Sequence, residues 1–363
     1  MIGSSVRGAT LVGPEQIEIR EYPRPAIPPD GALLAVEAGG VCGTDVKYFH
    51  ATIPLPYPVI LGHEIAGTIV EIGSVAKQLH DVAEGDRVIL KGSRGCGHCP
   101  DCRRGGPRFC KQKTNYGGTL TSDRPPHLFG GFADALYVAP DVVLTKVPDG
   151  ISADAAVLIG SVMANGYQWA VVQGGAHLGD YVLIQGPGQQ GLACLFAARA
   201  AGAGRIVVSG RGRDLERLRL AAAWGADRIV DVDTEDVLEV VRAETGGHMA
   251  DVVVDVSGSP AAIPTSLKAT RRQGTMVLAG LVGTSLSVPL EVDDVVWAEK
   301  RIQGAYTADA PALDATLRSI VRTGFPVEDM ISHRFALDET ERCIRAVGGE
   351  IPDLYPVKAV IRP

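Results

Sequence analysis

The sequence predicts an α/β fold in which a strand-rich part precedes a doubly wound parallel sheet. Up to about residue 150 the chain is rich in Gly and Pro. It carries short Val/Ile runs at 31–41, 63–73 and 85–92, which predict short strands joined by tight turns. From about Ile151 onward, apolar strand segments alternate with helical stretches, and this alternation is typical of a parallel sheet covered by helices.

The second part starts with an apolar strand at 180–185, which is followed by a glycine turn and an Ala-rich helix at 192–201. A further predicted helix at 214–224 stops at Gly225, and glycine is a typical residue after the last helical turn. Strand and helix in regular alternation predict the doubly wound sheet. The remaining expected elements are strands at 205–209, 228–231, 251–256 and 275–281, a helix at 311–323, and strand-like pieces near 331–335 and 357–361.

The chain of 363 residues is long for one compact core, so we expect two domains. The first domain is expected over 1–150 and includes a cysteine-rich lobe at 92–115. The second is expected over 151–303 and holds the doubly wound sheet. The strand–helix alternation loosens after this point, so 304–363 is expected to return to the first domain.

Composition and charge limit the class of protein. Hydrophobic residues make up 46% and charged residues 21% of the chain, which is typical of a globular protein. A formal net charge of −7 argues against nonspecific nucleic-acid binding. The N-terminus lacks the basic start and apolar core of a signal peptide, and no stretch approaches the length needed to span a bilayer. We therefore expect a cytoplasmic protein without a membrane partner.

A glycine-rich turn after the strand at 180–185 predicts a dinucleotide site. Gly186-Pro-Gly-Gln-Gln-Gly191 has the spacing G-x-G-x-x-G, follows a strand and opens a helix. In such a turn Gly186 permits the bend, Gly188 lets the backbone approach a pyrophosphate, and Gly191 lets the helix pack on the sheet. The free N–H groups and the positive dipole end of the helix then face the phosphates. The predicted cofactor-binding residues here are Gly186, Gly188, Gln189, Gln190 and Gly191, and an ordinary strand-to-helix turn is the alternative.

The end of the next strand bears on the choice between NAD and NADP. NAD sites place a carboxylate about twenty residues after the glycine turn, but no acidic residue occurs here before Asp214. Arg211 and Arg213 stand where the 2′-phosphate of NADP is expected, and guanidinium groups bind phosphate well. We therefore expect NAD(P) with a preference for NADP; the alternative is that both arginines are solvated surface charges. Asp214 is either a ribose ligand or a helix cap.

Four of the seven cysteines fall between residues 96 and 110, in the spacing C-x2-C-x2-C-x7-C. Four thiolates on a loop bent by Gly and Pro can close a tetrahedral shell around Zn²⁺. Because such a shell leaves no open position, we expect a structural site that holds together a lobe with almost no apolar core. The predicted ligands are Cys96, Cys99, Cys102 and Cys110, and a redox or disulfide cluster is the alternative.

Two short segments of the first domain supply a second candidate metal site. Cys42 and His63 carry ligand atoms that suit zinc, and Glu64 is either a third ligand or a group that supports one. A metal with an open position lowers the pKa of a water or alcohol oxygen bound there. We therefore predict that Cys42, His63 and Glu64 are catalytic residues.

These motifs resemble those of the zinc-dependent medium-chain alcohol and polyol dehydrogenases, and the resemblance covers nearly the whole chain. It implies a GroES-like, β-rich catalytic domain and a Rossmann cofactor domain. It also implies a cleft between the two in which a catalytic zinc faces the nicotinamide. The resemblance rests on GVCGTD (40–45), PVILGHEIAGTIVEIG (58–73), GDRVILKGSRGCGHCPDCRRGGPRFC (85–110), GGFADALYV (130–138), the GPGQQG turn and DVVVDVSG (251–258).

The family pattern gives Cys42 and His63 as ligands of the catalytic zinc, and the four clustered cysteines as ligands of the structural zinc. Thr44 resembles the hydroxyl that relays the proton of the substrate alcohol. Asp45 resembles the carboxylate that orients the histidine ligand. These roles are implied by the resemblance.

Two positions depart from the family pattern. Ser161 stands where the third zinc ligand is usually Cys, or Glu in polyol dehydrogenase relatives, and serine is a poor zinc ligand. Some polyol relatives use Cys, His and the adjacent Glu together with water, a set that Cys42, His63 and Glu64 match. Lys47 stands where a relay histidine often occurs, and His50 is either a substitute for it or a surface residue.

The resemblance implies a zinc-dependent, NAD(P)-dependent alcohol dehydrogenase that acts on a small-molecule alcohol and forms a homodimer or homotetramer. We expect the alcohol to be a secondary alcohol or polyol and the product to be a ketone or aldehyde. One alternative, which Ser161 favours, is a medium-chain reductase without catalytic zinc that acts on an enone or quinone. The other is a noncatalytic nucleic-acid-binding protein that uses a basic cysteine lobe, with Arg94, Arg103, Arg104 and Arg108.

Overall fold

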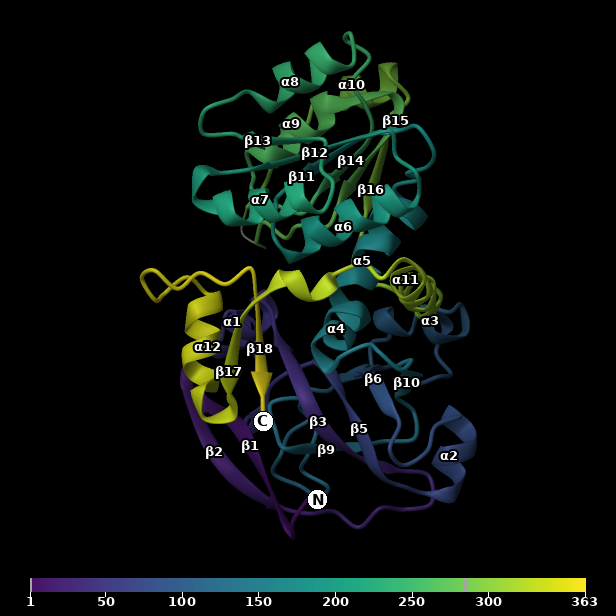
Figure 1. Cartoon of the computed structure of the whole chain (residues 1–363), viewed down its shortest axis with the longest axis vertical. Helices are drawn as coiled ribbons and strands as arrows, with labels where there is room; N and C mark the ends of the chain where they lie inside the picture. Colours follow the sequence, from purple (N-terminus) through teal and green to yellow (C-terminus); the bar gives the residue numbers. More distant parts are fainter. Residues whose placement is uncertain (1, 284–285) are drawn as a thin grey trace. The chain divides into compact units, whose positions relative to one another are not determined.

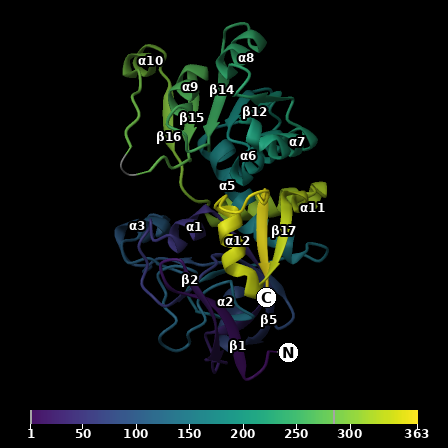
Figure 2. The same ribbon diagram turned by 90° about the vertical axis from the view of Figure 1, so that its left-hand side faces the viewer.

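The computed structural model describes residues 2–283 and 286–363, and the chain forms two compact units. Unit 1 comprises Met1–Gly160 together with Pro326–Pro363, and unit 2 comprises Ser161–Phe325. Figure 1 and Figure 2 show the helices and strands of both units from two directions.

Unit 1 is built around a mostly antiparallel sheet with the strand order β10-β6-β5-β3-β18-β17, and β9 also pairs with β3. A smaller sheet in the order β2-β1-β4 accompanies it. The strands of the main sheet are β3 (Ala32–Val41), β5 (Glu64–Ile72), β6 (Arg87–Lys91), β9 (Ala135–Val138), β10 (Val143–Lys146), β17 (Ile331–Ala336) and β18 (Lys358–Arg362). The smaller sheet contains β1 (Ser5–Gly13), β2 (Gln16–Pro23) and β4 (Val59–Ile60).

The C-terminal segment completes unit 1. Strand β18 pairs antiparallel with β3, and β17 pairs in parallel with β18, so the yellow strands in Figure 1 continue the sheet beside β3. Phe335 and Ile361 from this segment share one apolar core with Val41, Phe49 and Leu61 from the start of the chain. The two ends of the sequence therefore build one core.

Short helices connect or cover the strands of unit 1. None of them had a predicted counterpart, because each has fewer than nine residues and gives only a short pattern in the sequence. They are α1 (Gly43–Phe49), α2 (Ser74–His80), α3 (Pro100–Arg103), α4 (Ala153–Leu158) and α12 (Thr340–Val347).

Unit 2 contains a parallel sheet with the strand order β13-β12-β11-β14-β15-β16. In chain order this is 3-2-1-4-5-6, the doubly wound arrangement in which dinucleotides bind beyond the carboxyl ends of the central strands. The prediction of a doubly wound parallel sheet is therefore confirmed. The strands are β11 (Tyr181–Gln185), β12 (Arg205–Gly210), β13 (Arg228–Asp231), β14 (Ala250–Asp255), β15 (Thr270–Leu278) and β16 (Arg301–Gly304).

The helices of unit 2 are close to those predicted, with differences at their ends. Helix α6 (Gln189–Ala200) starts within the glycine motif, three residues before the predicted start, because Gly188 already serves as its N-cap. The strand predicted at 275–281 leaves the sheet after Leu278. Two eight-residue helices, α8 (Val237–Glu244) and α9 (Ala262–Ala269), had no predicted counterpart. The other helices are α5 (Ala164–Gly166), α7 (Leu215–Ala223), α10 (Val292–Trp297) and α11 (Ala310–Thr323).

The chain passes from unit 1 to unit 2 after Gly160 and returns to unit 1 after Phe325, later than the expected domain limits at 150 and 303. The first change falls inside a helical stretch that continues from α4 through π-helical turns, so the sequence has no linker there. At the second, α11 packs on α5, and the Phe325 ring lies 4.6 Å from that of Phe196 in unit 2. Packing thus keeps the chain in unit 2 until after Phe325.

The helical stretch Ala153–Gln173 is 21 residues long, its most apolar 18-residue window has a mean hydropathy of 1.3, and by length and composition it could cross a membrane. The expectation that no stretch approaches this length is therefore wrong by length and composition. Within the protein, 72% of its most apolar window is buried, as in the core helix of a globular fold. Packing accounts for its apolar composition.

Candidate active site and metal centres

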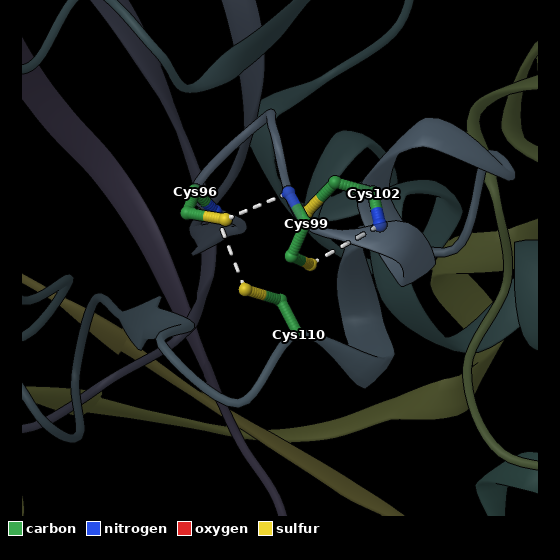
Figure 3. Close-up of side chains that lie close together, drawn as sticks. All are labelled: Cys96, Cys99, Cys102 and Cys110. Carbon is green, nitrogen blue, oxygen red and sulfur yellow. Dashed lines mark hydrogen bonds between the residues drawn. The ribbon is translucent and has the colours of Figure 1, made fainter.

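The four clustered cysteines converge in unit 1. Their sulfur atoms all lie within 4.8 Å of one another, and none of the four is in a disulfide. The ribbon formed by β7 (Ser93–Arg94) and β8 (Thr114–Asn115) closes the segment that carries them. Figure 3 shows the sulfurs gathered in one place. The N–H of Cys99 donates to the Cys96 sulfur at 3.3 Å, and the N–H of Cys96 donates to the Cys110 sulfur at 3.4 Å.

The electrostatics of this lobe suit a divalent cation. Backbone N–H donors at His98 and Cys99 lower the pKa of the Cys96 thiol to about 6, whereas desolvation raises the pKa of the Cys102 thiol to about 12. Four thiolates this close repel one another, so they do not all ionise without a positive charge between them. A tetrahedral zinc with bonds of about 2.3 Å holds its sulfurs about 3.8 Å apart, which the observed grouping accommodates. The residues therefore fit a closed four-thiolate zinc site.

A second group forms where β3 ends and α1 begins. Cys42 is the N-cap of α1, and its sulfur accepts the N–H of Thr44 at 3.3 Å and lies 3.2 Å from Nε2 of His63. On the other side of the ring, Oδ1 of Asp45 lies 3.3 Å from Nδ1 of His63. The other oxygen of Asp45 accepts the N–H of Cys42 at 2.9 Å. The His63 ring is thereby held between a sulfur and a carboxylate, and the three ligand atoms lie within 4.8 Å.

Charge and burial stabilise this orientation of the ring. Asp45 is fully buried, while the His63 side chain keeps 28% of its exposure. Burial alone would raise the pKa of Asp45, but the adjacent His63 and the Cys42 N–H hold it below its ordinary value. Burial likewise opposes the charge on His63, but Asp45 and Cys42 together raise its pKa well above the ordinary value. A sulfur and a ring nitrogen oriented by a carboxylate fit a zinc site that keeps open positions.

Glu64, predicted to join Cys42 and His63, lies elsewhere. Its carboxylate forms a buried ion pair with Nζ of Lys358, which also donates to the carbonyl of Val41 at 3.0 Å. His63 directly precedes β5 and Glu64 is its first residue, and the two side chains contact different partners. Gly40, opposite Glu64 on β3, makes room, since a Cβ there would lie 2.2 Å from the carboxylate oxygen. The structure therefore brings Asp45, and not Glu64, to the Cys42–His63 pair.

Lys358 is a site-adjacent residue that the sequence analysis missed. It is 2% exposed, and it lies in the apolar strand β18, 294 positions from Glu64 in the chain. A lysine within an apolar strand is itself a signal, because a buried ammonium needs a carboxylate partner. The sequence does not say which carboxylate that is.

The glycine turn of unit 2 has the geometry of a pyrophosphate site. Gly186 has φ +108°, which favours glycine, and a Cβ on Gly191 would lie 1.9 Å from the Gly186 carbonyl oxygen. A Cβ on Gly188 would meet nothing within 4 Å, so the backbone is open there. No side chain caps the start of α6, and the buried Oε1 atoms of Gln189 and Gln190 have no hydrogen-bond partner. A helix N-terminus with free donors above an open glycine backbone fits a dinucleotide phosphate.

Comparisons with known proteins show to which family the chain belongs. Residues 28–149 match the family of alcohol dehydrogenase GroES-like domains, and residues 191–322 match the family of zinc-binding dehydrogenases. A protein of Mycobacterium tuberculosis (strain CDC 1551 / Oshkosh), named as a probable alcohol dehydrogenase, is 37% identical over 366 residues, with 99% of each chain covered. The chain belongs to the zinc-dependent medium-chain alcohol dehydrogenase family.

A further relative and a solved structure are similar to the dehydrogenase over nearly its whole length. A sorbitol dehydrogenase of Bacillus subtilis (strain 168) is 31% identical over 353 residues, with 95% of each chain covered. A solved structure from Sinorhizobium meliloti 1021, described as a zinc-binding dehydrogenase bound to NADP, is 29% identical with a TM-score of 0.87. It covers 99% of this chain and 100% of its own.

The dehydrogenase is thus an NAD(P)-dependent oxidoreductase that interconverts a small-molecule alcohol and a carbonyl compound with zinc. The predicted GroES-like and Rossmann domains are confirmed. Relatives named for alcohol oxidation favour this reading over an enone or quinone reductase. Membership of this enzyme family also argues against the alternative of a noncatalytic nucleic-acid-binding protein.

His50 lies at the C-terminal end of α1, and its contacts make it a poor substitute for a relay histidine in the dehydrogenase. Its Nδ1 lies 2.9 Å from a carboxylate oxygen of Glu15, and its Nε2 lies 2.6 Å from one of Glu350. Both ring nitrogens are therefore engaged, and the ring joins α1 to the β1–β2 turn and to the end of α12. Lys47 is exposed.

The two arginines at the end of β12 differ in their surroundings. Nε of Arg211 lies 3.1 Å from Oδ1 of Asp233, whereas no ion pair of Arg213 is found among the described residues. The carboxylate of Asp214 accepts the N–H of Arg211 at 3.3 Å and pairs with Arg217 at 3.2 Å. Asp214 therefore closes the short turn at 212–214, but its side chain makes no cap hydrogen bond to α7.

Proposed function

We propose that Cys42 and His63 hold the catalytic zinc of the dehydrogenase and that its substrate is a secondary alcohol or a polyol. The observation that carries the proposal is the 3.2 Å approach of the Cys42 sulfur to Nε2 of His63, with Asp45 behind the ring. The polyol class is supported by the sorbitol dehydrogenase relative, at 31% identity.

A bound zinc supplies Lewis-acid activation of the substrate oxygen, and a bound nicotinamide supplies or accepts the hydride. Cys42 and His63 bind the metal, and Asp45 keeps the ring turned so that Nε2 faces the sulfur. Thr44, in the first turn of α1, relays the proton of the substrate hydroxyl: its Oγ1 accepts that proton while its own hydroxyl proton passes on toward solvent. Gly186, Gly188 and Gly191, with the start of α6, bind the pyrophosphate.

Glu64 has a positioning role in this proposal. Its pairing with Lys358 ties the start of β5 to β18 directly behind His63. Because both charges are buried, the pair keeps the backbone at His63 in one place. The ligand atoms of Cys42 and His63 are thereby pre-positioned for the metal.

We propose NADP as the preferred coenzyme. Arg211 and Arg213 follow β12, where the adenosine ribose of a dinucleotide lies in this sheet order. Gly212 stands between them and offers no carboxylate to the ribose hydroxyls. The relative from Sinorhizobium meliloti 1021, at 29% identity, binds NADP.

We also propose a homodimer or homotetramer that works in the cytoplasm. Strand β16 ends the described sheet of unit 2, so its outer edge has free backbone groups. Apolar side chains near this edge are exposed, with Trp297 at 84%, Val296 at 68% and Ile302 at 37%. An exposed strand edge beside apolar surface suits pairing with a second copy. A reducing compartment keeps the clustered thiols available for metal.

A substrate panel tests the proposed activity. Purified protein is assayed with NADP⁺ and NAD⁺ against secondary alcohols, polyols and primary alcohols, and with NADPH against enones. Oxidation of secondary alcohols or polyols at the highest kcat/KM supports the proposal. Reduction of enones without any alcohol oxidation overturns it. Light scattering at several protein concentrations tests the oligomer, and a monomer at all of them contradicts that part.

A further inference from the structure

The carboxyl ends of β12 and β13 bring two arginines and two aspartates together. Gly210, the last residue of β12, pairs with Asp231, the last residue of β13, so the segments that follow run side by side. Arg211 and Arg213 come from the first segment, and Asp231 and Asp233 from the second. On the proposed function, the adenosine ribose of the coenzyme lies here.

Asp233 is bound directly to the arginine segment. One oxygen accepts the N–H of Gly212 at 3.0 Å, and the other lies 3.1 Å from Nε of Arg211. Its own N–H donates to Asp231 at 3.0 Å, which fixes the turn. The Gly212 N–H and Arg211 hold the pKa of Asp233 below its ordinary value. Asp233 is therefore a carboxylate anion in the neutral pH range.

Gly212 shows how closely the carboxylates approach. A Cβ built on Gly212 would lie 3.1 Å from an oxygen of Asp231 and 3.7 Å from one of Asp233. Two carboxylates, one at the end of β13 and one in the turn after it, therefore lie against the residue between the two arginines. Arg213, with no ion pair among the described residues, remains the available cation.

These charges affect the binding of a 2′-phosphate, the group that distinguishes NADP from NAD. It carries nearly two negative charges and binds guanidinium groups through paired hydrogen bonds. Arg211 is already partly neutralised by Asp233, and both aspartates repel an added phosphate. A ribose with a free 2′-hydroxyl meets no such repulsion and finds acceptors in the same carboxylates.

We propose that Asp233 sets the coenzyme preference of the dehydrogenase by neutralising Arg211 and opposing a 2′-phosphate. The residue thereby keeps NAD competitive with NADP at a site whose arginines favour NADP. The inference rests on the proposed function and deepens it. Asp233 is 43% exposed, so solvent screens its effect and the expected change is moderate.

Equilibrium binding of NADPH and NADH, followed by coenzyme fluorescence, tests the proposal without any substrate. The variant is Asp233→Asn, which removes the charge and keeps an oxygen that can accept the Gly212 N–H. The control is Glu235→Gln in the same turn, because Glu235 pairs with Arg228 at 2.6 Å and not with Arg211. We expect the Kd ratio of NADH to NADPH to rise about fivefold in D233N and to stay within about twofold in E235Q.

An unchanged ratio in D233N, or an equal rise in E235Q, overturns the inference while leaving the proposed function intact. A wild-type protein that binds neither coenzyme overturns the proposed function and the inference with it. A second pair of variants does not depend on the folding of D233N. Arg213→Gln is expected to weaken NADPH binding more than Arg211→Gln, because Arg211 is already paired. Equal losses in the two variants contradict the inference.

Discussion

The two thiolate-bearing regions of unit 1 are built in different ways. The four-cysteine lobe takes all its sulfur atoms from the segment 96–110, and a two-strand ribbon closes it. The Cys42–His63 site takes a sulfur from the end of β3, a ring from the residue before β5 and a carboxylate from α1. The first is a local structure that a metal can hold together, whereas the second depends on the fold of the whole unit.

The two regions also differ in what lies behind the proposed metal ligands. In the lobe, backbone N–H groups of the same segment donate to the sulfurs. Behind Cys42 and His63 lie a fully buried carboxylate, Asp45, and the buried pair of Glu64 and Lys358. We infer that loss of the lobe metal lowers mainly the stability of the protein. Loss of the second metal lowers mainly its catalytic activity.

The largest expected difference separates Cys42→Ser from Cys99→Ser. C42S is expected to lower kcat/KM about 1000-fold, because several kcal/mol of metal activation are lost. C99S is expected to lower the Tm by roughly 10 °C, because the lobe loses its metal and has little core of its own. Steady-state kinetics at low temperature and thermal unfolding of both variants measure the contrast.

The control for this pair is Cys194→Ala, a fully buried thiol of unit 2 that belongs to neither cysteine group. It is expected to keep kcat/KM within about threefold of wild type, since it removes only packing. If C42S and C99S lose activity and stability in the same proportion, the two regions do not have separate roles.

The next largest effect is expected at the buried pair behind His63. Lys358→Met leaves the carboxylate of Glu64 buried without a cation, which costs about 3 kcal/mol of unfolding free energy. The double variant with Glu64→Gln is expected to recover part of this loss. Urea unfolding measures both, and Arg219→Met, from an exposed pair with Glu216, is the control with a loss below about 0.5 kcal/mol. Equal stability of K358M and wild type would falsify the assignment of Glu64 to Lys358.

A smaller effect is expected from the carboxylate that orients His63. Asp45→Asn keeps the shape but loses the charge at Nδ1, and outer partners of metal ligands typically matter by about 10- to 100-fold in activity or metal affinity. The measurements are kcat/KM and the affinity for added zinc. Substitutions in the four-cysteine lobe are expected to leave the zinc affinity of the catalytic site unchanged. A D45N enzyme with wild-type zinc affinity and kcat/KM would rule out the role of Asp45.

The smallest effect is expected at His50, at the C-terminal end of α1. Glu15 and Glu350 raise the pKa of His50 above its ordinary value of 6.5. Because the folded pKa lies above the unfolded one, this stabilisation is fully present below the unfolded pKa and is lost as pH rises through the folded pKa. His50→Gln should therefore cost up to about 1 kcal/mol near pH 6 and less near pH 9. Urea unfolding at both pH values checks this, and a cost that does not change with pH would contradict it.

Local patterns in the sequence predict much of this protein. The spacing of Cys96–Cys110, the glycine turn at Gly186 and the alternating strands and helices of unit 2 all depend on neighbours in the chain. Features that join distant segments could not be read in this way. The Lys358–Glu64 pair spans 294 positions. The Asp233–Arg211 contact requires the pairing of β12 with β13.

Glu64 illustrates the same limit at a single position. The sequence places it beside His63, and this adjacency suggested a shared metal. In the structure the two side chains contact different partners, and Asp45, from another segment, lies beside the ring instead. Only the folded sheet determines which carboxylate reaches the histidine.

Unit 1 is proposed to hold two metals of different kinds, and the zinc content per chain tests this most directly. Elemental mass spectrometry is applied to dialysed wild-type protein and to the C42S and C99S variants. We expect two zinc ions per wild-type chain and one in each variant, with activity retained only where the Cys42 site is filled. One zinc per wild-type chain that C42S leaves unchanged would contradict the claim, and the Cys42–His63 pair would then not be a metal site.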